Sequence, residues 1–182
     1  MINLFKIVVC MTAGAQKREW DIDKYVETMR RISCKNEISW ILIGSGMQAE
    51  KCAARVADKL DFASVVNLVN RTSLRQTGAV LKQSDMYFGG DTGPMHMAVA
   101  AGLSGVVLSC HPIGAAQEHA NAPERFGPWQ SNMEVLRPEA LPGCENGCVK
   151  EYAHCINQIR VEDVVKSMEK IIESSDKEYS GA

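Results

Sequence analysis

The run GGDTGPMHMAVAAG (89–102) holds the densest set of residues in this chain that could do chemistry. It offers a carboxylate, a hydroxyl and an imidazole, from Asp91, Thr92 and His96. A D-T-G triplet also carries the catalytic aspartate of aspartic proteases, which need two carboxylates that share one proton. This sequence holds a single copy, and a helix is predicted to start within three residues of it. The protease triplet sits in an all-β fold, so a protease is excluded and Asp91 needs another explanation.

The triplet lies between a predicted strand over 85–90 and a predicted helix over 94–101. The first N–H groups of a helix have no partner within it, and with the positive end of the helix dipole they attract anions. Gly93 lets a ligand approach the backbone closely, and Thr92 adds a hydroxyl. A diphosphate suits such a site. The alternative is that Asp91 or Thr92 only caps the helix.

Two further loops hold candidate ligand-binding residues. The segment TAGAQKREW (12–20) follows the first predicted strand and supplies Thr12, Lys17 and Arg18. A hydroxyl and two cations at the edge of a sheet are suited to phosphate, although a solvated loop would have the same composition. The segment GSGMQAE (44–50) resembles a glycine-rich phosphate loop but lacks the full G-x-G-x-x-G spacing, so it is a weak dinucleotide motif.

The C-terminal region contains a cluster of potential metal ligands, Cys144, Cys148, His154 and Cys155. Four such residues can build a tetrahedral zinc site, although the usual C-x2-C spacing is missing. Reduced thiols that pack an irregular tail, or one disulfide, are the alternatives.

The elements that position these residues alternate along the chain. Strands are predicted at 5–12, 39–44, 64–68, 85–90, 105–110 and 133–136, and helices at 21–32, 49–60, 72–83, 94–101 and 161–175. This alternation is typical of βαβ units. It predicts an α/β fold, a Rossmann-like three-layer domain with a mainly parallel sheet. Residues 1–175 are expected to form one domain, with an irregular loop over 111–132, and 176–182 a frayed tail.

Composition excludes several classes of protein. A formal net charge of −2 gives no electrostatic reason to bind nucleic acid or an anionic membrane. No apolar run approaches the ~20 residues that a membrane-spanning helix needs. The 7 cysteines are odd in number and scattered, unlike a secreted disulfide framework. These features favour the cytoplasm.

The stretch TSLRQTGAVLKQSDMYFGGDTGPMHMAVAAG (72–102) closely resembles family 9 glycosyltransferases, the lipopolysaccharide heptosyltransferases. In that family a T-S-L helix leads to a strand and then to a D-T-G-P-x-H turn and helix. Weaker similarities follow the same order elsewhere, in TAGAQKREWDIDKY, ILIGSGMQAEK, FGPW and CENGCVKEYAHCINQIRVEDV. The resemblance covers most of the chain.

The resemblance implies a GT-B type enzyme with two Rossmann-like halves that face each other across a cleft. This chain is similar to the C-terminal half, which binds a nucleotide-diphosphate sugar such as ADP-heptose. The acceptor site for a lipopolysaccharide or other envelope glycan, and the general base, belong to an N-terminal domain absent from this chain. The implied transfer is inverting and needs neither metal nor cofactor. The isolated half should therefore catalyse the transfer poorly. The resemblance also allows peripheral association of the full enzyme with the inner face of the membrane.

By matching position, the resemblance assigns donor contacts to Thr12, Lys17, Arg18, Gln48, Glu50, Asp91, Thr92, Gly93, Met95 and His96. The residues of the D-T-G-P-x-H turn would hold the diphosphate and sugar, and Lys17 or Arg18 would neutralise phosphate charge. Gln48 or Glu50 would approach the ribose, and Met95 would line the base pocket.

One departure leaves the donor sugar open. The family's G-P-T-D-P stretch appears here as CHPIG (110–114), without the Thr-Asp pair. Two alternatives therefore stand beside the glycosyltransferase: one half of a nucleotide-sugar epimerase, and a non-catalytic nucleotide-binding or interaction module.

Overall fold

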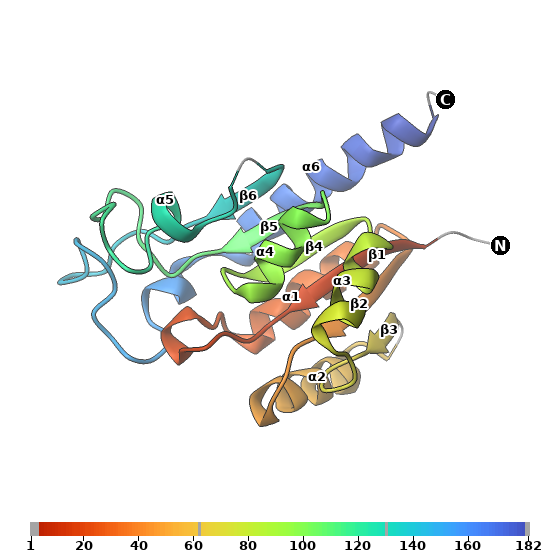
Figure 1. Cartoon of the computed structure of the whole chain (residues 1–182), viewed down its shortest axis with the longest axis horizontal. Helices are drawn as coiled ribbons and strands as arrows, with labels where there is room; N and C mark the ends of the chain where they lie inside the picture. The colour runs from red at the N-terminus through yellow and green to blue at the C-terminus, as the bar shows by residue number, and fades with distance from the viewer. Residues whose placement is uncertain (1–3, 62, 130, 181–182) are drawn as a thin grey trace.

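A single parallel sheet organises the molecule. The computed structural model describes residues 4–61, 63–129 and 131–180. Within them a 6-stranded sheet has the order β3-β2-β1-β4-β5-β6, and every neighbouring pair of strands is parallel. The strands are β1 (Phe5–Cys10), β2 (Ile38–Ile43), β3 (Ser64–Asn67), β4 (Met86–Gly90), β5 (Ser104–Leu108) and β6 (Met133–Leu136). This is the strand order of the doubly wound dinucleotide-binding fold. The predicted Rossmann-like fold is confirmed (Figure 1).

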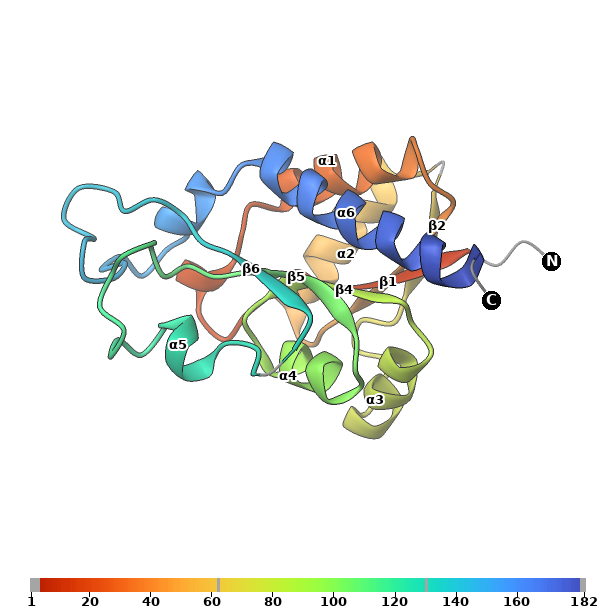
Figure 2. The same cartoon turned by 90° about the horizontal axis from the view of Figure 1, so that it is seen from above.

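Helices cover both faces of the sheet, which gives three layers (Figure 2). On one face lie α1 (Ile22–Ser33), α2 (Met47–Lys59) and α6 (Val161–Ser180). On the other lie α3 (Leu74–Lys82) and α4 (Gly93–Ala100). The remaining short elements are the 3-10 turns η1 (Gln16–Arg18) and η2 (Cys155–Gln158) and the single-turn helix α5 (Pro123–Phe126). Among the described helices, none combines the length and apolarity that crossing a bilayer requires.

The central strand β1 shows how the sequence produces two cores. Side chains alternate between the faces of a strand. Ile7 and Val9 accordingly join the cluster under α1, α2 and α6, whereas Val8 and Cys10 join the one under α3 and α4. All four are buried. A strand covered on both faces reads as a continuous apolar run, which is how KIVVC reads in the sequence.

The predicted elements agree with the structure to within a few residues. Helix α3 begins at a Ser73 N-cap, whose hydroxyl accepts from the Gln76 N–H in a capping box. The last helix is longer than predicted, because α6 continues to Ser180 and takes in backbone that the sequence assigned to a frayed tail. The tail's last two residues, 181–182, and the domain's first three, 1–3, lie outside the described residues.

Candidate functional site

The strongest candidate site is a cavity where the loops after β1, β4 and β5 meet. In the order β3-β2-β1-β4-β5-β6, the chain adds β2 and β3 on one side of β1 and then returns to add β4, β5 and β6 on the other. The strand order therefore reverses between β1 and β4. Open α/β sheets bind ligands in the crevice at the carboxyl ends of such neighbouring strands. A cavity of about 360 Å³ lies there, and its walls are Gly14, Arg18, Asp91, Thr92, Gly93, His96, Ala120, Asn121 and Phe126.

The start of α4 forms one wall of this cavity. Thr92 is the N-cap, in extended conformation, and its side chain makes no capping bond, while its carbonyl accepts from the N–H groups of Met95 and His96. Pro94 carries no N–H. A Cβ added to Gly93 would meet no atom within 4 Å, so the backbone there opens onto free space. The positive end of the helix is therefore accessible to an anion.

Asp91 sits beside this helix start in a partly desolvated position. Its side chain is 15% exposed, and its Oδ1 lies 4.0 Å from Nε2 of His96, which is 53% exposed. Burial raises the pKa of the Asp91 carboxyl above its ordinary value, and the nearby His96 and Arg18 act in the opposite direction. The cavity thus holds an acceptor, an imidazole and a cation around one helix N-terminus.

The adjacent cations Lys17 and Arg18 were both predicted as candidates to neutralise phosphate charge, and their side chains point to different partners. Arg18 lines the cavity, and its guanidinium lies 3.2 Å from the position of a Cβ on Gly14. Lys17 instead donates to Glu151 at 3.3 Å and is 22% exposed. The cation at the cavity is therefore Arg18.

The remaining predicted donor contacts are not in the cavity wall. The hydroxyl of Thr12 lies 3.6 Å from the position of a Cβ on Gly44. Glu50 accepts from the side-chain amide N–H of Asn70 at 2.7 Å, and the side-chain oxygen Oδ1 of Asn70 accepts from the Gly46 N–H at 2.8 Å. Gln48 is exposed on the first turn of α2. These groups lie at the same edge of the sheet as the cavity, since β1 and β2 are parallel.

The structure corrects the prediction for Met95. That side chain is 0% exposed and packs in the core between the sheet and α4, so it does not line an open base pocket. Gly89, in the same run, has a different role, because a Cβ there would lie 2.4 Å from the Cys10 carbonyl oxygen. Gly89 is required by the sheet, whereas Gly93 is the glycine that opens to a ligand.

Sequence reasoning missed the third wall of the cavity, which Ala120, Asn121 and Phe126 supply from the irregular loop. A pair of histidines organises that loop: His111 is buried and stacks on His119 at 4.9 Å, and the His119 Nδ1 accepts from the Asn121 N–H at 3.1 Å. Burial lowers the pKa of His111. Nothing in the spacing of the sequence marks these residues, because an irregular loop has no periodicity to read.

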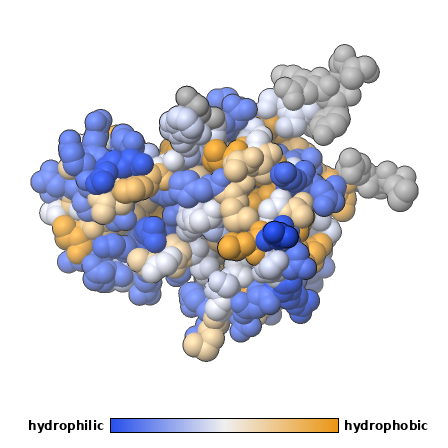
Figure 3. Space-filling view, in the orientation of Figure 1, coloured by the Kyte–Doolittle hydropathy of each residue, from blue (hydrophilic) through white to orange (hydrophobic). Residues whose placement is uncertain are grey.

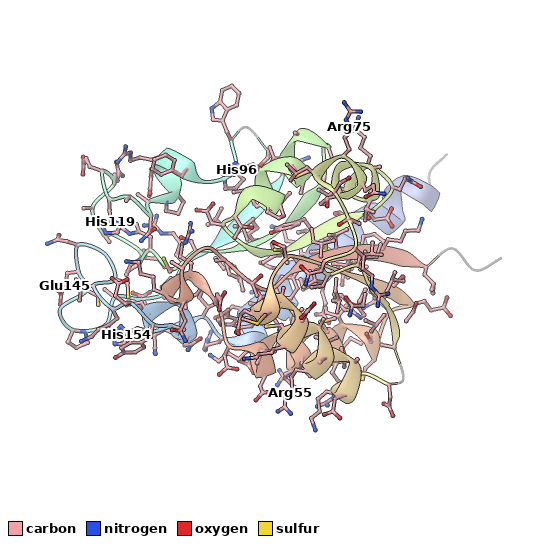
Figure 4. The ribbon with its side chains drawn as sticks, turned by 60° about the horizontal axis from the view of Figure 1, so that its bottom comes forward. Arg55, Arg75, His96, His119, Glu145 and His154 are labelled. Atoms are coloured by element: carbon pink, nitrogen blue, oxygen red, sulfur yellow. The ribbon has the colours of Figure 1, made fainter. Side chains whose placement is uncertain are left out.

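The four potential metal ligands do come together. Their donor atoms lie within 4.8 Å of one another, in the lobe that the irregular segments build. His154, Glu145 and His119 share this lobe, away from Arg55 on α2 and Arg75 on α3 (Figure 4). The surface of the same end is largely hydrophilic, whereas hydrophobic residues gather over the middle of the face in view (Figure 3).

A comparison with known proteins decides the family. Residues 3–151 match the family described as Glycosyltransferase family 9 (heptosyltransferase), and these are most of the 182 residues. The chain belongs to glycosyltransferase family 9. The predicted resemblance to this family is therefore confirmed.

Individual relatives agree with the family assignment. The chain is 21% identical over 166 residues to a lipooligosaccharide heptosyltransferase 2 of Campylobacter jejuni. The matched region covers 87% of this chain and 48% of the relative. The fold superimposes on E. coli ADP-heptose lps heptosyltransferase II with a TM-score of 0.74 at 18% identity, over 97% of this chain and 49% of that one. For E. coli heptosyltransferase WaaC with ADP the TM-score is 0.70, at 18% identity, over 92% of this chain and 44% of that one. The chain spans about half the length of the curated relatives it matches.

Proposed function

We propose that this chain is the C-terminal, donor-binding half of a family 9 glycosyltransferase and that its cavity binds a nucleoside diphosphate sugar. The observation that carries the proposal is the meeting of an open helix N-terminus with Arg18 in one cavity of about 360 Å³. An anion with several oxygens is the ligand that both groups attract. Family membership supplies the class of reaction.

The polar groups of the cavity divide by their hydrogen-bonding chemistry. Backbone N–H groups at the start of α4 and the guanidinium of Arg18 can only donate, so we assign them to the diphosphate. The ionised carboxylate of Asp91 can only accept, so we assign it to hydroxyls of the donor sugar. We assign His96, whose Nε2 lies 4.0 Å from Asp91 Oδ1, to the space between the diphosphate and the sugar.

In the proposed reaction, a hydroxyl oxygen of the acceptor attacks the anomeric carbon of the donor sugar. The bond from that carbon to the diphosphate oxygen breaks, and the electron pair leaves with the diphosphate. Fixed N–H donors and a fixed cation stabilise the departing charge without reorganisation, which is the role that a metal fills in other enzymes. A single displacement inverts the anomeric centre. The proton of the attacking hydroxyl passes to a general base, and we assign that base and the acceptor site to a part of the enzyme outside these 182 residues.

Two lines of support specify the donor and the setting. The solved relatives are named for ADP-heptose and for ADP, so we propose an ADP-heptose-like donor and an envelope glycan acceptor such as lipopolysaccharide. Gln48 and Glu50, at the same sheet edge, are assigned to the ribose. None of the seven cysteines, all within the described residues, forms a disulfide, which suits a reducing compartment, and we propose the cytoplasm.

Calorimetric titration of the 182-residue chain tests this proposal. ADP, UDP and their sugar conjugates are titrated into the wild type, the Asp91→Ala/Thr92→Ala double variant and an Asp58→Ala control on the exposed surface of α2. We expect saturable binding of an ADP conjugate, weakened about tenfold or more by the double variant, because a charged acceptor and a hydroxyl are lost. The control should bind like the wild type. No saturable binding, or binding untouched by the double variant, would contradict the proposal.

A further inference from the structure

Three thiols and one imidazole converge in the irregular segment between β6 and α6. The Sγ atoms of Cys144, Cys148 and Cys155 lie 3.8, 3.8 and 3.4 Å from Nδ1 of His154. All four donor atoms are within 4.8 Å of one another. The three cysteines are almost completely buried, at 1%, 3% and 0% exposure.

The local backbone is built to aim two of these thiols at one point. Cys144 and Cys148 each follow a glycine with positive φ, Gly143 at 81° and Gly147 at 135°. The Gly147 N–H donates to the Cys144 carbonyl at 3.0 Å, which closes the turn between the two cysteines. Glycine is the residue that adopts these conformations without steric cost. The sequence GCENGC therefore encodes a turn that brings its two sulfur atoms together.

Hydrogen bonding does not account for this arrangement. A neutral imidazole nitrogen that accepts has one lone pair, and here three sulfur atoms surround the same Nδ1. Ordinary apolar packing does not account for it either, because among the described residues Leu141 is the one aliphatic side chain packed against the three cysteines. A disulfide would use two of the thiols and leave the third beside the imidazole.

The sulfur–nitrogen distances agree with a tetrahedral metal ion. Zinc binds cysteine sulfur at about 2.3 Å and histidine nitrogen at about 2.0–2.1 Å, which places neighbouring ligands of a tetrahedron about 3.6–3.8 Å apart. The Sγ–Nδ1 separations of 3.4–3.8 Å bracket this edge. The widest separation among the four donor atoms, up to 4.8 Å, is longer than a sulfur–sulfur edge, so the thiols would draw together around the ion. A Cys3His ligand set is one of the common structural zinc sites.

We propose that Cys144, Cys148, His154 through Nδ1, and Cys155 bind one zinc ion in a closed tetrahedral site. Four protein ligands leave no open position for substrate, so the ion is structural and takes no part in glycosyl transfer. The proposal stands apart from donor binding, and either can fail without the other.

The zinc would fasten together segments that reach the rest of the domain. Directly after Cys155, the Asn157 side chain accepts from the Asp21 N–H at 3.1 Å, and the Ile159 carbonyl accepts from Trp20 Nε1 at 3.2 Å. Between the ligands, Glu151 holds Lys17 at 3.3 Å. The ion thus ties the C-terminal lobe to the loop that carries Arg18.

Metal analysis of the purified wild-type chain is the first test. After exposure to excess zinc and desalting, we expect about one zinc per chain, and far less in Cys148→Ser, which removes one ligand. Cys34→Ser is the matched control, since Cys34 is an exposed thiol outside the cluster, and it should retain the wild-type content. Less than about a tenth of an equivalent in the wild type, full retention in Cys148→Ser, or iron in place of zinc would overturn the proposal.

A second measurement decides the matter even where Cys148→Ser fails to fold. Cobalt(II) titrated into the zinc-free wild type should give the intense visible bands of a tetrahedral thiolate site, and zinc should displace them. His154→Cys keeps four ligands, so it should still bind one metal ion with an altered spectrum, whereas His154→Ala should bind it more weakly. A pale octahedral cobalt spectrum in the wild type would refute the site.

Discussion

Arg18 and Lys17 are neighbours with the same charge, and they are predicted to contribute very differently to binding of a nucleoside diphosphate. Arg18 lines the cavity beside Asp91, whereas the amine of Lys17 is held by Glu151 at 3.3 Å. Arg18→Ala removes a charge-assisted hydrogen bond, which is worth about 1.5–3 kcal/mol. Because each 1.4 kcal/mol is about a factor of ten in affinity, we expect Kd to rise about 10- to 100-fold. Lys17→Ala should raise Kd less than about threefold, through the lost charge alone.

The two variants are a matched pair, since each removes one positive charge one residue from the other. Calorimetric titration of ADP into wild type, Arg18→Ala and Lys17→Ala at one fixed salt concentration measures both effects. General electrostatic attraction changes equally in the two variants, so their difference isolates direct contact. Equal losses, or a larger loss in Lys17→Ala, would refute the reasoning.

Three other predictions follow from the same geometry. Gly93→Ala should keep the free energy of unfolding within about 0.5 kcal/mol of wild type but weaken ADP binding, because its Cβ enters open space at the anion site. Gly89→Ala should instead lose about 1–3 kcal/mol of that free energy or fail to fold, since its Cβ would lie 2.4 Å from the Cys10 carbonyl oxygen. Ser73→Ala should lose about 1 kcal/mol in urea unfolding, because it removes the capping box of α3. Burial lowers the pKa of His111 below its ordinary 6.5, so below about pH 6.5 the unfolded chain binds a proton at His111 that the folded chain does not bind. The free energy of unfolding of wild type should therefore fall as the pH is lowered through this range, and it should fall less steeply in His111→Gln.

Each of these predictions has an outcome that contradicts it. A stable Gly89→Ala variant would mean that β1 and β4 are not packed as described. Ser45→Ala, in an exposed loop, is the control for Ser73→Ala and should leave the unfolding midpoint unchanged. If Ser73→Ala also left it unchanged, the Ser73 cap would not stabilise the protein. Parallel pH profiles for wild type and His111→Gln would show that His111 is not buried in its neutral form.

The repeating elements were predictable because their periodicity is encoded locally. Apolar runs such as KIVVC mark buried parallel strands, and Ser73 with Gln76 marks a helix start. The orientation of α4 was not predictable in the same way. Its residues are apolar on nearly every side, so the sequence does not say that Met95 faces the core.

The site was predictable in part for a related reason. A helix N-terminus after a strand is a local feature, so Asp91, Thr92 and Gly93 could be placed at the sheet edge from sequence. The choice between Lys17 and Arg18 depends on Glu151, which is 134 residues away from Lys17 along the chain. Contacts of that kind, like the wall supplied by Asn121, arise only once the chain has folded.

The most direct test of the central claim is to locate the diphosphate on the protein. Backbone amide resonances of the 182-residue chain are followed by NMR while ADP is titrated in, and while adenosine is titrated into a second sample. We predict that ADP, but not adenosine, shifts the Thr92 and Gly93 amide protons strongly, together with the guanidinium signal of Arg18. Shifts confined to the loops around Gly46 and Asn70, with Thr92 and Gly93 unmoved, would contradict the claim that the start of α4 holds the diphosphate.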